Sequence, residues 1–282
     1  MNAPKRHHYL PESYQKGFWN KRDEKIFFIE IESGKQVALA PLNAAVKRYM
    51  YRFDNPVEGV SATAIENPLL SDLDGRYVSA LSSLEERFSP DERQSLAVAL
   101  AFLRFRVPLM FRSFEYQATQ VFIDSIRTDL VKASEAARLG IDLSSVEAFD
   151  SSTHGMLEVP KDLVLMMFLR SSAEFAFDIV GLDWKVYVSD DNSFITSDKP
   201  FTAVEGLGEF SHGFIRGTYI IPLSSRCLLE LGEVGGGLSF ETVSVEQAEF
   251  FNGIIAHCAD ERIFGSSFAQ LEAALKYSDR LI

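Results

Sequence analysis

The hydrophobic period of this 282-residue chain changes twice, and that change limits the folds it can adopt. Short stretches rich in β-branched and aromatic residues lie toward both ends, at 25–31, 36–40, 184–188, 218–221 and 227–231. Between them, apolar residues recur at intervals of three and four, which is the period of an amphipathic helix. The pattern predicts an α+β fold, with a mainly antiparallel sheet built from N- and C-terminal strands and packed against a helical middle section.

Capping signals locate the long helices. Ser89-Pro90-Asp91-Glu92 should start a helix that Pro108 kinks near Arg104 to Arg106. Pro160 should open a buried helix that ends near Val180, and the Ser244-Val245-Glu246-Gln247 sequence should cap the last long helix. The apolar stripe between residues 62 and 88 predicts a further amphipathic helix.

Three weaker patterns complete the expected organisation. Residues 49–53 predict a strand, residues 184–188 and 193–196 predict a hairpin around Asp190-Asp191-Asn192, and residues 144–155 predict an exposed loop. We find no internal repeat and no convincing linker, so we expect a single domain over 1–282. Its parts would be an N-terminal arm and strands (1–55), a helical section (62–180) and C-terminal strands and helices (183–282).

The charge balance bears on partners. The net charge is −12, yet residues 1–52 carry ten Lys or Arg against five Asp or Glu. An acidic surface repels nucleic acid at long range, so duplex binding would need a local basic patch or bound metal ions. A solvated N-terminal face that keeps the protein soluble explains the asymmetry more simply, and the sequence leaves nucleic acid binding and the oligomeric state open.

The hydrophobic segments and cysteines bear on location. The longest apolar run, Leu163 to Leu169, is too short for a bilayer span, and the polar start of the chain has no apolar signal segment. Cys227 and Cys258 lie in apolar segments, as small buried residues do in a reducing compartment, and we expect no disulfide. We therefore expect a soluble cytoplasmic protein without membrane contact.

Aromatic and titratable residues are dense in the N-terminal arm, residues 5–19. If this arm were disordered, its tyrosines, Phe18 and Trp19 would be left in water, so we expect the arm to pack on the core. His8 would then be partly buried. A histidine there serves either as a hydrogen-bond partner or, because its pKa is near neutral, as a base or metal ligand.

A strand end near residue 198 is the most conspicuous polar motif. The apolar Phe194-Ile195 pair runs into Thr196-Ser197-Asp198-Lys199-Pro200, and Pro200 must end the strand because it has no N–H for a ladder. Asp198 either closes a turn on neighbouring backbone or supplies a carboxylate for chemistry.

The helical section offers further candidates. Arg106 lies at the predicted kink, and an arginine held beside a core needs an anionic partner, unless its side chain reaches water. Glu66 and Asp74, eight residues apart, fall within about 80° of each other on a helix at roughly 100° per residue. They could hold a divalent metal ion or act as acid and base, although two carboxylates on a solvated face explain the pair more simply.

The chain resembles the bacterial family catalogued as domain of unknown function 4238. The resemblance rests on short ordered motifs, which are His8-Tyr9-Leu10-Pro11 with Tyr14 and Gly17-Phe18, Arg106-Val107-Pro108, Thr196 to Pro200, Ile221-Pro222-Leu223-Ser224, Asn252 and Phe264-Gly265-Ser266. Lys199 departs from the asparagine usual there and places a cation beside Asp198, and Leu10 replaces a valine or isoleucine. The resemblance implies that His8, Arg106, Asp198 and Asn252 belong to one pattern, as residues of an assembled site would.

Two functions fit these residues. In a hydrolase acting on a phosphodiester or another anionic substrate, in the manner of a nuclease, His8 would be base or metal ligand, Asp198 ligand or orienting group, Arg106 anion clamp and Asn252 positioner. Glu66 or Asp74 could complete a metal site. In the alternative, a non-catalytic binding module, the same residues would lock the arm and the sheet around a ligand or partner protein.

Overall fold

A computed structural model describes residues 6–84, 88–130, 159–191, 193–203 and 218–280, with the backbone alone over 122–130. It has the mixed α+β architecture predicted from the sequence, in which helices between residues 65 and 180 separate N-terminal from C-terminal strands. The predicted loop at 144–155, with His154, and the helical pattern beyond residue 130 lie outside the described residues.

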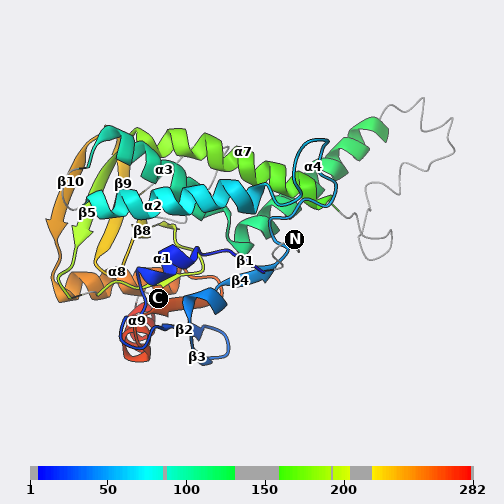
Figure 1. Ribbon diagram of the computed structural model, residues 1–282. Coiled ribbons are helices and arrows are strands. Elements are labelled where there is room, and N and C mark those ends of the chain that lie inside the picture. Colours follow the sequence, from blue (N-terminus) through cyan, green and yellow to red (C-terminus); the bar gives the residue numbers. More distant parts are fainter. Residues whose placement is uncertain (1–5, 85–87, 131–158, 192, 204–217, 281–282) are drawn as a thin grey trace.

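Three long helices, α2, α3 and α7, lie side by side, with the largest sheet against one end of them (Figure 1). The helices of the described chain are α1 (Glu12–Lys16), η1 (Pro41–Asn43), η2 (Ile65–Leu70), α2 (Ser71–Leu84), α3 (Pro90–Phe105), α4 (Pro108–Leu130), α7 (Lys161–Val180), α8 (Val245–His257) and α9 (Phe268–Ser278). Ser89 and Ser244 form the capping boxes predicted for α3 and α8, because each side chain accepts a backbone N–H while a Glu or Gln side chain reaches back.

The described strands form three sheets, ordered β1-β4, β10-β5-β9-β8-β7 and β3-β2-β11-β6. Their bounds are β1 (Arg6–His8), β2 (Ile26–Glu30), β3 (Gln36–Leu39), β4 (Val46–Arg48), β5 (Leu182–Val188), β6 (Thr196–Ser197), β7 (Thr202–Ala203), β8 (Tyr219–Pro222), β9 (Cys227–Val234), β10 (Leu238–Thr242) and β11 (Arg262–Gly265). N- and C-terminal strands meet in the third sheet, where β2 pairs antiparallel with β11. The β2–β3 hairpin is also as predicted.

The N-terminal arm packs against the core, as its aromatic residues predicted. Tyr14 is fully buried, and its hydroxyl lies 2.7 Å from the Thr196 hydroxyl and donates to the Pro222 carbonyl oxygen at 2.8 Å. Tyr77 of α2 donates to the carbonyl of Leu223. The arm therefore joins α2 to the ends of β6 and β8, and it positions the motifs on which the family resemblance rests.

One predicted strand in the N-terminal half is wrong, and the predicted helix that α2 confirms starts later than its apolar stripe. Residues 49–51 form a turn and 52–53 are irregular; Tyr49 has a positive φ of 53°, and the backbone N–H of Tyr51 donates to His7 Nδ1. The strand lies three residues earlier, in β4. The predicted helix at 62–88 begins as a π-helix and is interrupted at Asn67, whose φ and ψ are extended, before Pro68. The regular helix starts only at Ser71.

The predicted hairpin between 184–188 and 193–196 is also wrong. Strand β5 pairs with β9 and β10 instead, and β6 pairs with β11. The sequence analysis missed β10, which lies parallel to β5 and is largely exposed. Asp198 therefore follows β6, an edge strand of the third sheet, and lies next to the segment 260–262 that leads into β11.

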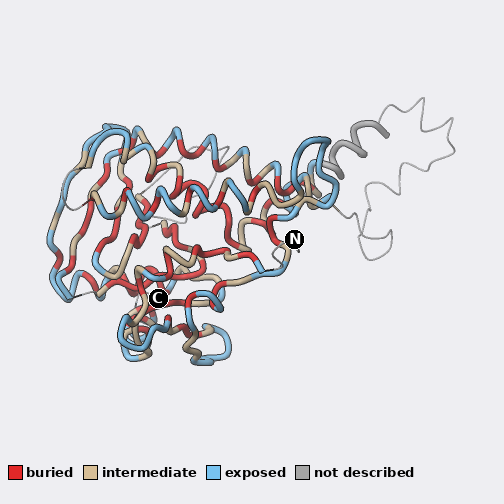
Figure 2. The backbone as a smooth tube through the Cα atoms, viewed as in Figure 1, coloured by how far each residue is buried: buried red, intermediate tan, exposed pale blue. Residues whose placement is uncertain are grey.

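The predicted kink before Pro108 is a sharp bend. Within the described chain, no single helix is long and apolar enough to span a membrane; α3 and the Pro108–Val121 part of α4 reach that length and composition only together, across a bend of 69°. Most of α3 is buried, and Figure 2 shows buried residues gathered where the helices face one another and the sheets.

Candidate functional site

Asp198 is 5 % exposed and uses both carboxylate oxygens to bind backbone. The N–H of Asp260 donates to Oδ1 at 3.0 Å, and those of Glu261 and Arg262 donate to Oδ2 at 2.8 and 3.1 Å. Burial raises the pKa of Asp198 to about 6, although the hydrogen bonds from the backbone N–H groups lower it. Asp198 thus fixes the chain that enters β11, and a raised pKa makes it titrate closer to neutrality than an ordinary aspartate.

Tyr9 connects the arm to this position. Burial raises the pKa of the Tyr9 hydroxyl to about 12; the charge of Arg262 lowers this pKa, and the charges of Asp198 and Glu261 raise it. Arg262 in turn pairs with Glu30 of β2 at 3.2 Å. The residue after His8 therefore lies beside the Asp198 carboxylate, so the arm contributes to this corner of the structure.

Arg106 and His8 meet through a backbone carbonyl. Arg106 is 3 % exposed; its Nη2 donates to the carbonyl oxygen of His8 at 2.8 Å and its Nη1 pairs with Asp74 Oδ1 at 2.8 Å. The hydroxyl of Tyr51 donates to the Arg106 carbonyl at 2.7 Å. Asp74 is therefore the anionic partner that a buried arginine requires.

The His8 ring points elsewhere. Its Nε2 lies 3.1 Å from the carbonyl oxygen of Leu42, and burial lowers its pKa while that hydrogen bond raises it. The fully buried histidine of the pair is His7, whose Nδ1 accepts from Tyr51 N at 2.9 Å. His7 is a structural residue that the sequence analysis missed, although the His-His pair was visible.

Glu66 and Asp74 form an unequal carboxyl pair. Burial raises the pKa of Glu66; the charge of Arg106 opposes this shift and that of Asp74 adds to it. Glu66 Oε2 is buried without a hydrogen-bond partner among the described residues, whereas Asp74 is paired with Arg106. Two carboxyl groups with different hydrogen-bond partners thus lie near one arginine, an arrangement that could serve acid–base chemistry.

Arg104, the other arginine of the bend, lies among aromatic rings. Its guanidinium carbon is 4.5 Å from the ring centre of Phe175 and 5.2 Å from that of Tyr219, with Phe105 and Phe201 at 5.4 and 5.3 Å. Burial lowers its pKa to about 10. Cation–π contacts therefore help to hold this charge in the interior.

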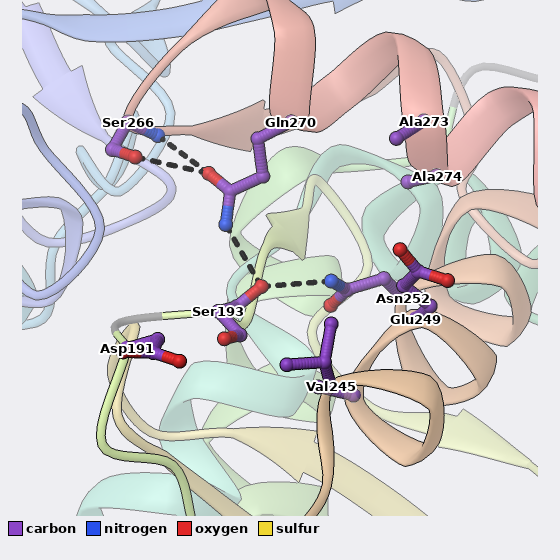
Figure 3. Close-up of a pocket in the computed structure, with 10 residues that line it drawn as sticks. Asp191, Ser193, Val245, Glu249, Asn252, Ser266, Gln270, Ala273 and Ala274 are labelled. Atoms are coloured by element: carbon purple, nitrogen blue, oxygen red, sulfur yellow. Dashed lines mark hydrogen bonds between the residues drawn. The ribbon is translucent and has the colours of Figure 1, made fainter.

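Asn252 lies in a different place, a pocket of about 330 Å³ between α8 and α9 (Figure 3). Its Oδ1 accepts the N–H of Ile195 at 3.0 Å, and its Nδ2 donates to the Ser193 carbonyl oxygen at 2.8 Å. Gln270 of α9 donates to the same oxygen at 2.8 Å. The two amides thus fasten the segment before β6 to both helices.

The six candidates fall into separate groups. Arg106 binds both the His8 carbonyl oxygen and the Asp74 carboxylate, Glu66 is coupled electrostatically to Arg106 and Asp74, and Asp198 is reached through Tyr9. No hydrogen bond among the described residues joins Asn252 to any of them. Nor, in the described part of the chain, do three or more His, Cys, Asp or Glu side chains gather closely enough to hold a metal ion.

A second pocket, of about 490 Å³, was not anticipated. We call it the basic pocket, because four cationic side chains line it together with Trp19 and several small or polar residues; the cations are Lys16, Lys21, Arg22 and Arg226. None of the described residues that line it is acidic. Ser266 lines both this pocket and the one that holds Asn252, so the two are neighbours.

The basic pocket forms where the arm meets the turn between β8 and β9. The carbonyl of Gly17 accepts the N–H of Ser225 at 2.8 Å, and a Cβ on Gly17 would lie only 3.4 Å from the Leu223 carbonyl oxygen. Ser224 Oγ accepts the N–H of Arg226 at 3.2 Å. The excess of basic residues in 1–52 was the sequence signal for this pocket. The contribution of Arg226 could not be predicted from the spacing of residues in the sequence.

A family model described as "Protein of unknown function (DUF4238)" matches residues 6–268, and the chain belongs to that family. A search of the curated proteins and a search of the solved structures each found no match.

Proposed function

We propose that this protein binds a small anionic ligand in the basic pocket. The observation that carries the proposal is the gathering of four cations, and of no described acidic residue, around about 490 Å³ in a chain of net charge −12. Pockets of 300 to 1,000 Å³ suit small molecules. Of these cations only Lys16 has a carboxylate partner among the described residues, Glu12 at 2.7 Å. The other three cations, Lys21, Arg22 and Arg226, are therefore available to bind a ligand.

The neighbouring contacts support this use. Arg226 Nε lies 3.5 Å from the Ser189 carbonyl oxygen, and its two terminal nitrogens have no hydrogen bond within the described chain. Guanidinium groups offer paired donors that match phosphate and carboxylate oxygens. Asp23 and Glu24 follow in the same turn as Arg22 but do not line the pocket.

Titration calorimetry with inorganic pyrophosphate tests the proposal. Saturable binding should weaken about fivefold in Arg226→Gln, since a partly exposed charge contact is worth about 1 kcal/mol. Lys35→Gln, which removes an exposed charge from the β2–β3 turn outside the pocket, should bind as the wild type does. Absence of saturable binding, or equal losses in both variants, would refute the proposal.

Hydrolysis of an anionic substrate is the second candidate function, and the unequal Glu66–Asp74 pair beside Arg106 favours it. Glu66, whose pKa burial raises, would be the proton donor, and Asp74 would hold Arg106 in place, with a divalent ion supplied by the assay where the reaction needs one. Turnover of activated phosphodiesters that disappears in Glu66→Gln, while the fold and pyrophosphate binding persist, would support this function. Unchanged turnover in Glu66→Gln would remove the pair from any mechanism.

A further inference from the structure

Trp19 indicates what the anionic ligand carries besides its charge. The indole is partly buried against the core, and it lines the basic pocket beside the cations. Lys16 Nζ lies 5.9 Å from the Trp19 ring centre, and both residues line the pocket. The pocket thus combines an aromatic surface with guanidinium and ammonium groups. Nucleobases stack on aromatic side chains, and phosphates bind cations, so this combination matches a nucleotide better than a bare anion.

We infer that the ligand of the basic pocket is a free nucleotide, whose phosphates contact Arg22, Lys21 and Arg226 and whose base lies against Trp19. This inference rests on the proposed function and names its ligand class. A volume of about 490 Å³ accommodates a single nucleotide. A nucleic acid strand would extend over the rest of the surface, where the net charge of −12 repels a polyanion.

The positions of the cations fit a ligand whose phosphates and base bind different parts of the pocket. Lys21 and Arg22 follow Trp19 within three residues, in the turn closed by the bridge between Asn20 and Lys25. Arg226 comes from a second wall of the pocket, the turn between β8 and β9, where Ser224 fixes its backbone. Phosphates bound between these walls would place the base next to the indole, and Lys16 would stay with Glu12.

Fluorescence and calorimetry together test the inference. The chain has two tryptophans, and Trp184 is 1 % exposed with its indole N–H donated to the Ile179 carbonyl oxygen, so a quench by ligand reports Trp19. Adenosine diphosphate should quench this emission and bind roughly tenfold more tightly than inorganic pyrophosphate, because base stacking on an aromatic residue contributes about 1–3 kcal/mol.

Variants of Trp19 separate the contribution of the base to the binding affinity from that of the phosphates. Trp19→Leu should weaken adenosine diphosphate binding more than pyrophosphate binding, so that the ratio of the two affinities falls from roughly ten toward one, whereas Trp19→Phe should keep part of that ratio. If Trp19→Leu does not fold, the comparison of the two ligands on the wild type and on Trp19→Phe decides the question.

The outcomes distinguish the two proposals. Equal affinity for adenosine diphosphate and pyrophosphate would overturn the nucleotide inference and leave anion binding standing. No binding of either ligand would overturn both. Much tighter binding of a short oligothymidylate than of thymidine monophosphate would assign the pocket to a single strand and overturn the free-nucleotide assignment.

Discussion

Replacing Asp198 with asparagine should make the free energy of unfolding less dependent on pH. The pKa of Asp198 rises from its ordinary value of 3.8 to about 6 because the carboxyl is buried. The folded state therefore holds this proton more tightly than the unfolded chain. The associated stability is fully present below about pH 4 and is lost as pH rises through about 6.

The size of the effect follows from the shift. A rise in the pKa from 3.8 to about 6 corresponds to about 3 kcal/mol, since one pKa unit is about 1.36 kcal/mol. Asparagine has no proton to lose, and its amide oxygen can still accept from the backbone at 261 and 262. Relative to the wild type, Asp198→Asn should therefore gain about 3 kcal/mol of stability between pH 3.5 and pH 7.5.

Urea denaturation at several pH values measures this difference, with fluorescence and circular dichroism followed together to check that the transitions coincide. Asp190→Asn is the matched control, because it removes an exposed carboxylate from a turn. Asp198→Ala should be less stable than Asp198→Asn at every pH, since it leaves three backbone N–H groups without their acceptor.

If the difference in free energy of unfolding between wild type and Asp198→Asn did not change with pH, this reasoning would be refuted. A difference of the opposite sign would show that the three N–H donors, and not burial, set the pKa of Asp198. In that case the carboxylate would be ionised throughout, and the segment 260–262 would be held by charge-assisted hydrogen bonds alone.

Three other substitutions test the packing around the arm and the C-terminal helices by the same denaturation assay. Arg106→Met should cost about 3–5 kcal/mol, since it leaves the Asp74 carboxylate half-buried without its partner, and a loss below 1 kcal/mol would show that water replaces the arginine. Tyr51→Phe should cost about 1 kcal/mol through the lost hydrogen bond to a buried carbonyl, and an unchanged midpoint would contradict that bond. Gly253→Ala should cost about 1–3 kcal/mol, because its Cβ would lie 2.5 Å from a Tyr277 ring carbon; a neutral result would mean that α9 moves away freely.

Local signals predicted the elements whose causes are local. The Ser89 and Ser244 caps, the bend before Pro108 and the β2–β3 hairpin depend on neighbouring residues, and each was located from sequence. The strand predicted at 49–53 failed because a distant group, the His7 ring, accepts the N–H of Tyr51. Tertiary contacts overrode strand propensity there.

Long-range pairing explains the other failures. Strand β10 is a short, largely exposed segment whose partner in the described sheet is the distant strand β5. The hairpin predicted after Val188 required β5 to pair with the next apolar segment, whereas β9 offers β5 a longer antiparallel partner. Neither choice could be read from the segments alone, since a short apolar run does not specify its neighbour.

The candidate site shows the same contrast between local signals and long-range contacts. The residue types that attract attention in the sequence are those that bind backbone in the structure: Asp198 holds 260–262, Asn252 holds 193–195, and Arg106 holds the carbonyl of His8. The cations of the basic pocket lacked a motif, because Arg226 is separated from Arg22 by some two hundred residues of sequence.

This contrast changes how functional mutagenesis should be interpreted. A variant of Asp198, Arg106 or Asn252 that loses function also loses hydrogen bonds between distant segments, so its inactivity cannot by itself assign a catalytic role. Arg226 and Lys21 lie at exposed positions, where substitution costs little stability. A loss of ligand binding in those two variants, with an unchanged free energy of unfolding, therefore identifies a functional contact, whereas the same loss at the buried positions must first be corrected for unfolded protein.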